Sequence, residues 1–160
     1  MTPSAPQRRP HRDREAAPAP FRLERHLFYY FTQILSRRQR ALNLELRRFG
    51  LDYSRWRVMA VLNEHAGCSM QLLAELTSVD RTTLTHTLRL MEGEALIARQ
   101  ARASDRRSVE VSLTLYGRKT LKQILPTVLA QTERAFAGFG AAEIERLRRQ
   151  LARMVDNLKA

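Results

Sequence analysis

The spacing of apolar residues changes along the middle of the chain and predicts four short elements between residues 68 and 117. Ser69 can cap a first helix, whose apolar positions are expected on one side: Leu72, Leu73 and Leu76. A second helix begins after a cap at Asp80, ends near Gly93 and is expected to turn three residues toward the core: Leu84, Leu88 and Met91. Residues 97–101 and 108–114 then predict two strands. The predicted order is helix, turn, helix and hairpin.

The hairpin has a basic turn. Alternation in its second strand predicts Val109, Val111 and Leu113 inward and Ser108, Glu110 and Ser112 outward. Residues 99–107 contain arginines at 99, 102, 106 and 107 against one acid, a local net charge of +3. Arginine favours a narrow, electronegative minor groove, so this loop suits DNA. Asp105 is expected to orient a neighbouring guanidinium through a bidentate pair.

The second helix turns polar and cationic side chains outward: Arg81, Thr82, Thr85, His86 and Arg89. Such side chains suit a DNA major groove, where arginine can bond guanine and threonine can contact a thymine methyl or a phosphate. Taken alone, this helix could equally present a merely solvated surface. The adjoining basic hairpin favours the DNA-binding interpretation.

Residues 21–49 predict one long helix that ends at Gly50, since glycine commonly stops helices. Two apolar rows follow it, one with Tyr30, Ile34, Ala41 and Leu44 and the other with Leu27, Phe31, Leu35, Leu42 and Phe49. Arg37 interrupts the first row and Arg38 the second. Each arginine can extend its charge to solvent or bind an anionic effector, and both interpretations stay open.

Two further helices are predicted over residues 115–137 and 141–158, separated by glycines at 138 and 140. Pro126 is expected to kink or offset the first. Their apolar stripes are Leu121, Ile124, Leu125, Val128 and Leu129, and Ile144, Leu147, Leu151, Met154, Val155 and Leu158. A lone domain would leave these stripes in water, so both helices are assigned, with the 21–49 helix, to dimerisation.

Composition bounds these interpretations. A chain of 160 residues with 44% hydrophobic content can form one domain with a real core. No apolar run approaches the roughly 18 residues that a spanning helix needs, so no membrane partner is expected. The net charge of +12 favours a polyanionic binding partner, although +5 of it lies in residues 21–49 and +5 in residues 115–160.

The first 20 residues contain five prolines and four arginines, which predicts a disordered tail able to touch DNA nonspecifically. No leader pattern is visible, which favours the bacterial cytoplasm and its nucleoid.

Catalytic and metal chemistry find no support in the sequence. The histidines at 11, 26, 65 and 86 lack metal-ligand spacing, and His65 and Cys68 have no evident further ligands. No phosphate-binding glycine loop or nucleophile elbow occurs. We therefore expect no enzyme, no cofactor and no metal, and an inert, buried Cys68.

Three stretches together resemble the MarR family of winged helix-turn-helix regulators. They are Asp105-Arg106-Arg107 followed by Leu113-Thr114 and Gly117, Asp80-Arg81-Thr82-Thr83-Leu84-Thr85, and Trp56-Arg57-Val58-Met59. The resemblance covers residues 21–159. His86 stands where relatives usually carry arginine, and Ala95 where they often carry glycine. The base preference is therefore not carried over.

The resemblance implies a mainly α fold with a small β-wing and a twofold dimer on a pseudo-palindromic operator. Recognition helices would lie in successive major grooves and wings in the flanking minor grooves. The implied segments are a tail (1–20), a dimerisation helix (21–49), a DNA-binding region (50–114) and C-terminal dimerisation helices (115–160). The expected DNA contacts are Arg81, Thr82, Thr83, Thr85, His86 and Arg89 on the helix, and Arg102, Ser104, Asp105, Arg106 and Arg107 in the wing.

Relatives bind effectors where the first helix meets the helix at Trp56 and the long C-terminal helix. The matching residues here are Tyr29, Ser36, Arg37, Arg38, Arg40 and Trp56, which suit an aromatic acid or its acyl-coenzyme A thioester. The resemblance therefore implies a ligand-responsive transcriptional regulator that leaves DNA when its effector binds, and repression is the usual outcome in relatives. A nonspecific nucleoid-type architectural protein is the alternative, since it would also be basic and dimeric.

Overall fold

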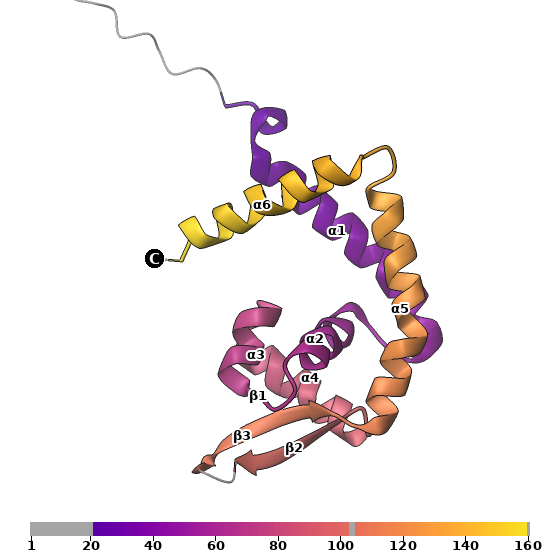
Figure 1. The fold of residues 1–160 in the computed structure, drawn as a ribbon. Coiled ribbons are helices and arrows are strands. Elements are labelled where there is room, and N and C mark those ends of the chain that lie inside the picture. The colour runs from indigo at the N-terminus through magenta and orange to yellow at the C-terminus, as the bar shows by residue number, and fades with distance from the viewer. Residues whose placement is uncertain (1–20, 103–104, 160) are drawn as a thin grey trace, which may run out of the picture. The chain divides into compact units, whose positions relative to one another are not determined.

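The computed structural model describes residues 21–102 and 105–159, apart from the side chains of 102 and 105–108. The chain divides into two compact units, Met1–Ile34 and Leu35–Ala160. The first elements are η1 (Leu23–Arg25), α1 (Leu27–Leu46), η2 (Arg47–Phe49) and α2 (Tyr53–Glu64). The middle of the chain forms β1 (Cys68–Ser69), α3 (Met70–Thr77), α4 (Arg81–Gly93), β2 (Ile97–Arg102) and β3 (Asp105–Leu113). Helices α5 (Leu115–Ala135) and α6 (Ala141–Asn157) follow (Figure 1).

The first predicted helix is wrong at both ends. His26 adopts an extended conformation between the 3₁₀ turn η1 and helix α1, and a second 3₁₀ turn, η2, follows α1. Apolar spacing over three residues cannot distinguish a 3₁₀ turn from an α-helical one. The glycine stop is confirmed, because Gly50 has a left-handed backbone with φ of 69°.

The sheet is antiparallel, with β3 between β1 and β2. The two residues of β1 were missed, because so short a strand has no period. Val111 and Leu113 are buried as predicted, but Val109 is 36% exposed, so the expected inward position is wrong for that residue. Ser112 is half-buried and its hydroxyl accepts a hydrogen bond from Gly67 N at 2.8 Å. The register pairs Ile97 with Leu113 and slips near the end of β2.

Helices α3 and α4 begin at the predicted caps. The Ser69 hydroxyl accepts from Leu72 N at 3.2 Å, and the Asp80 carboxylate accepts from Thr83 N at 2.9 Å. The three α4 side chains predicted to face the core are fully buried: Leu84, Leu88 and Met91.

The three leucines of α3 do not share a buried side, contrary to the prediction. Leu73 is fully buried, but Leu72 is 38% and Leu76 is 41% exposed. Leu72 and Leu76 are one turn apart, whereas Leu73 lies about 100° around the helix from Leu72. This eight-residue helix turns Leu73 and Thr77 inward, which leaves the other two leucines toward solvent.

Helix α5 packs closely against the turn before β2. Thr114 caps it, accepting from Gly117 N at 2.9 Å and donating to Ala95 O at 2.6 Å. A Cβ atom on Gly117 would lie 2.0 Å from the Leu96 carbonyl oxygen. The glycine of the sequence signature is therefore required by a backbone contact.

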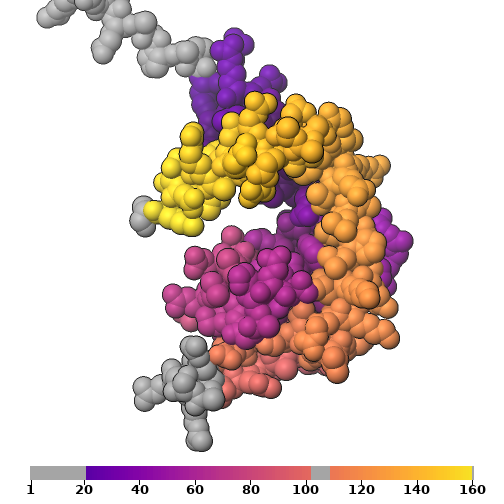
Figure 2. Space-filling view, in the orientation of Figure 1, coloured from indigo at the N-terminus to yellow at the C-terminus, as the bar shows by residue number. Residues whose placement is uncertain are grey.

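Helices α5 and α6 end within two residues of their predicted ends. Of the α5 stripe, Leu121, Ile124 and Val128 are buried, while Leu125 and Leu129 are 36% and 57% exposed. Helix α6 buries no residue, and Figure 2 shows one face of this helix at the surface. None of the described helices is long and apolar enough to cross a membrane.

Candidate nucleic-acid interface

Helix α4 presents the five outward residues that the sequence predicts. Arg81, Thr82, Thr85, His86 and Arg89 are all exposed and together line one hollow of about 430 Å³. The opposite side of the helix carries the fully buried leucines, so the hollow rests on a fixed core. This surface combines guanidinium, imidazole and hydroxyl groups that can bond phosphates and base edges.

The first turn of α4 is held by its cap. Hydrogen bonds from Thr83 lower the pKa of the Asp80 carboxyl below its ordinary value of 3.8. Thr83 is exposed, but it is not among the residues that line the hollow. The Thr85 hydroxyl donates to Arg81 O at 2.7 Å, so its hydrogen is used within the helix while its oxygen can still accept a hydrogen bond. Thr85 is therefore an acceptor rather than a phosphate donor in this rotamer.

The wing prediction lies largely outside the described residues. Ser104 and the side chains of Arg102, Asp105, Arg106 and Arg107 belong to that part. Arg99, counted with the basic loop in the sequence, instead places its Nε 3.2 Å from Glu92 Oε2 of α4. Its guanidinium therefore belongs to the joint between the wing and the helix.

Of the predicted effector residues, Arg38 has the most informative contact. Its Nη1 donates to the Tyr53 hydroxyl at 3.4 Å, and the Arg57 guanidinium lies 5.9 Å from the centre of the same ring. All three side chains are half-buried. Tyr53 and Arg57 are not among the residues that the sequence predicts for an effector site, although their four-residue spacing on a helix indicates that their side chains are neighbours.

The other predicted effector residues do not join this cluster through any described contact. Arg37 is exposed, Trp56 is a core residue at 9% exposure, and Arg40 donates to the carbonyl of Ser36 at 3.4 Å. Tyr29 lies in the other compact unit.

Metal and thiol chemistry find no support among the described residues. In residues 21–102 and 105–159, no three His, Cys, Asp or Glu side chains are grouped to hold a metal ion. Burial raises the pKa of the Cys68 thiol, and only 3% of this residue is exposed. The protonated thiol is a poor nucleophile, as expected for an inert buried cysteine.

Comparisons with known proteins agree with this geometry. The MarR family model matches residues 51–109, which contain α2, the helix-turn-helix and most of the wing. The HTH-type transcriptional repressor IacR of Pseudomonas putida is 26% identical over 98% of this chain and 93% of its own length. The chain is therefore similar to the MarR family of transcriptional regulators over this region. The winged helix-turn-helix fold expected from the sequence is confirmed, since solved MarR-family regulators have the same fold.

Solved MarR structures share the fold over most of the chain. A MarR-family regulator from Silicibacter pomeroyi has a TM-score of 0.79 and 26% identity, covering 86% of this chain and 93% of that one. BpsR of Bordetella bronchiseptica has a TM-score of 0.77 and 22% identity, covering 86% and 99%. The solved structure of BpsR concerns how 6-hydroxynicotinic acid regulates the DNA binding of BpsR. These relatives are regulators and not enzymes.

Proposed function

We propose that this regulator binds a pseudo-palindromic operator as a homodimer and leaves it when a small anionic aromatic effector binds. The observation that carries the proposal is the single exposed surface formed on α4 by Arg81, Thr82, Thr85, His86 and Arg89. Repression is the expected outcome, in line with the similarity to a named repressor. Such a protein would act at the nucleoid in the bacterial cytoplasm.

We assign different roles to different segments of the chain. Residues 50–114 would read DNA, with α4 in the major groove and the wing in the adjacent minor groove. Residues 21–49 and 115–160 would dimerise, and residues 1–20 would form an accessory tail. Thr82, Thr85 and His86 lie between two arginines on α4, so we assign them to base edges and the arginines to guanine or phosphate.

Exposed apolar side chains support the dimer. On α6, Leu151 and Val155 are 36% and 57% exposed, and the C-cap Leu158 is 71% exposed. On α1, Leu35 and Leu44 are 58% and 65% exposed. Apolar stripes of this extent usually mark an interface. A second copy is the natural occupant, because a twofold dimer pairs each stripe with its own equivalent.

The effector would bind at the Arg38, Tyr53 and Arg57 cluster. Two half-buried guanidinium groups approach one aromatic ring there, which suits a carboxylate attached to an aromatic ring. The regulation of BpsR by 6-hydroxynicotinic acid supports this class of ligand. An acyl-coenzyme A thioester is the larger alternative. Arg37 is exposed, so it fits the solvated interpretation better than Arg38 does.

The proposed DNA binding is tested by measuring affinity for a DNA duplex from the region upstream of the gene that encodes this protein. The salt concentration is fixed and random DNA is the competitor. Arg89→Ala and Arg107→Ala should each weaken binding by about 1 to 3 kcal/mol. His86→Ala should change the preferred base at one or two positions of each half-site. Arg153→Ala, an exposed arginine of α6, is the matched control and should bind like the wild type. Equal affinity for every sequence would favour the architectural alternative.

The effector proposal is tested on the preformed complex. Aromatic acids and their coenzyme A thioesters are titrated into complexes of the wild type, Arg37→Ala and Arg38→Ala. Arg38→Ala should keep DNA affinity within about threefold but need more ligand for release, since a charge-assisted bond contributes roughly 1.5 to 3 kcal/mol. The same release concentration for all three proteins would assign both arginines to solvent.

A further inference from the structure

The end of the recognition helix carries charges of the wrong sign for a helix C-terminus. Glu92 lies in the last turn of α4, Glu94 follows it as the C-cap, and the last turn contains no basic residue. The C-terminal end of a helix has a partial negative charge, so carboxylates there are unfavourable unless cations from elsewhere compensate them. Two arginines from other elements do so here.

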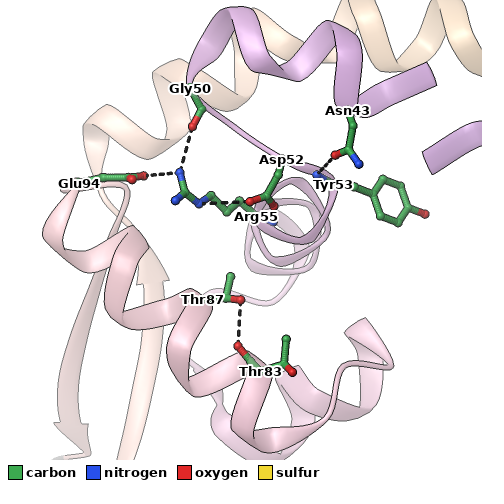
Figure 3. A network of polar contacts seen from close by, with 8 residues as sticks. All are labelled: Asn43, Gly50, Asp52, Tyr53, Arg55, Thr83, Thr87 and Glu94. Carbon is green, nitrogen blue, oxygen red and sulfur yellow. Dashed lines mark hydrogen bonds and ion pairs between the residues drawn. The ribbon is translucent and has the colours of Figure 1, made fainter. Parts of the chain in front are cut away.

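Arg55 of α2 reaches Glu94. Its Nη1 lies 3.0 Å from Glu94 Oε2 and donates to the Gly50 carbonyl at 2.9 Å, while its Nε is 3.6 Å from Asp52 Oδ2 (Figure 3). Its side chain is only 15% exposed. The Arg55 guanidinium therefore contacts the Gly50 carbonyl after α1, the Asp52 cap of α2 and Glu94 at the end of α4.

Arg99 of β2 approaches the same end of α4. Its Nε is 3.2 Å from Glu92 Oε2, and its side chain is 25% exposed. Among the described residues its buried Nε and Nη2 have no hydrogen-bond partner, so the interaction is an ion pair of poor hydrogen-bond geometry. Arg55 combines an ion pair with a backbone hydrogen bond and is the better anchored of the two.

The orientation of α4 at its C-terminal end determines where the side chains at its N-terminal end lie. Because α4 rises about 1.5 Å per residue, a tilt of about 10° at Glu94 would move Arg81 by about 3 Å. Base-edge hydrogen bonds do not tolerate such a displacement. Nonspecific attraction to phosphates tolerates it much better.

We propose that Arg55 is a positioning residue for DNA recognition. It holds the C-terminal end of α4 against the turn between α1 and α2, and it sets operator affinity without touching DNA. The inference rests on the proposed DNA-binding function for its biological meaning, but the restraint itself is a property of the free protein.

The restraint is tested first without DNA. Hydrogen exchange is measured on the free wild type, on Arg55→Met, which keeps the apolar stem, and on Glu94→Gln. Amides of residues 90–94 should exchange about tenfold faster in both variants, because local opening of the helix end becomes easier. Arg47→Met is the control, since Arg47 is an exposed arginine of the same turn region. Unchanged exchange at residues 90–94 in both variants would overturn the proposal.

The effect on DNA is tested over a range of salt concentrations with the upstream duplex and with random DNA. Arg55→Met should bind the upstream duplex about tenfold more weakly, with random-DNA affinity and the salt dependence unchanged. A salt slope lower by about one would make Arg55 a phosphate contact and overturn the proposal. Arg55→Lys keeps a cationic donor for the Glu94 carboxylate and should bind the upstream duplex within about threefold of the wild type, whereas an affinity as low as that of Arg55→Met would overturn the proposal.

The outcomes separate the two proposals. Wild-type protein with no preference for the upstream duplex would refute the proposed operator binding, while the exchange data would still judge the restraint. Suppose instead that the wild type prefers the upstream duplex over random DNA, and that Arg55→Met and Glu94→Gln prefer it to the same degree. That result would refute the positioning role but not operator binding. Should Arg55→Met fail to fold, Glu94→Gln removes the same ion pair from a side chain that is 44% exposed.

Discussion

Residues 42–128 and helix α6 have similar apolar patterns but bury them to different extents. Every buried apolar side chain of the described residues lies within residues 42–128, and none of the 17 residues of α6 is buried. Both segments have leucines at helical spacing. The first completes its core within one chain, whereas the second leaves its stripe half-buried or exposed.

This difference indicates where stability depends on protein concentration. A core closed by a single chain is stabilised by folding alone, whereas an open stripe gains its burial only from a partner. Changes within residues 42–128 should therefore alter unfolding at any concentration. Changes on α6 should alter association first.

The largest effect is expected at Gly117, inside the completed core. Gly117→Ala would place a Cβ atom 2.0 Å from the Leu96 carbonyl oxygen. Since a backbone atom cannot move aside cheaply, we expect a loss of about 3 kcal/mol or more in the free energy of unfolding. Urea unfolding at two protein concentrations measures it.

Gly93→Ala is the control for that substitution. A Cβ atom there meets nothing within 4 Å, and alanine favours helices over glycine by about 1 kcal/mol. This variant should be neutral or more stable. Equal stability of Gly117→Ala and the wild type would show that the contact between α5 and the turn can relax.

The next effect concerns the open stripe of α6. Leu151→Asp places a charge where a partner would cover the helix, and we expect the dimer dissociation constant to rise about a hundredfold or more. Light scattering after size exclusion would report monomers at concentrations where the wild type is dimeric. Arg153→Asp, on the polar side of α6, should leave the mass unchanged. A dimeric Leu151→Asp protein would exclude α6 from the interface.

A smaller effect, of opposite sign, is expected at Ala95. This residue has a left-handed backbone with φ of 56° between α4 and β2, a conformation that disfavours a side chain. Ala95→Gly should raise the free energy of unfolding by up to about 1 kcal/mol, since relief of strain exceeds the added entropy of the unfolded chain. Ala98→Gly, within β2, should lower it. A destabilised Ala95→Gly variant would mean that packing of the alanine methyl group stabilises the folded protein.

The smallest effect is a pH dependence at the cap of α4. Because folding lowers the pKa of Asp80, its carboxylate stabilises the folded state fully above the unfolded pKa. That contribution is lost as pH falls through the lower folded pKa. Asparagine also caps helices but does not ionise. The stability difference between the wild type and Asp80→Asn should therefore shrink between about pH 6 and about pH 2. A constant difference in acid unfolding curves would contradict this.

Local patterns were sufficient for much of the fold and part of the site. The caps at Ser69 and Asp80, the stop at Gly50 and the two sides of α4 were all predicted correctly. Each depends on residues within about one helical turn of one another, where side-chain spacing and backbone hydrogen bonds act directly. The sequence by itself therefore determined most of the helices, their caps and the outward surface of α4.

Only the tertiary structure decided which partners these elements meet. It turned Leu73 inward and left Leu72 exposed, it paired β1 with β3, and it directed Arg99 to α4 rather than to the loop. The ion pair between Arg55 and Glu94 joins residues 39 positions apart. No local pattern encodes such a contact, because it depends on where separate backbones come to lie when the core closes around them.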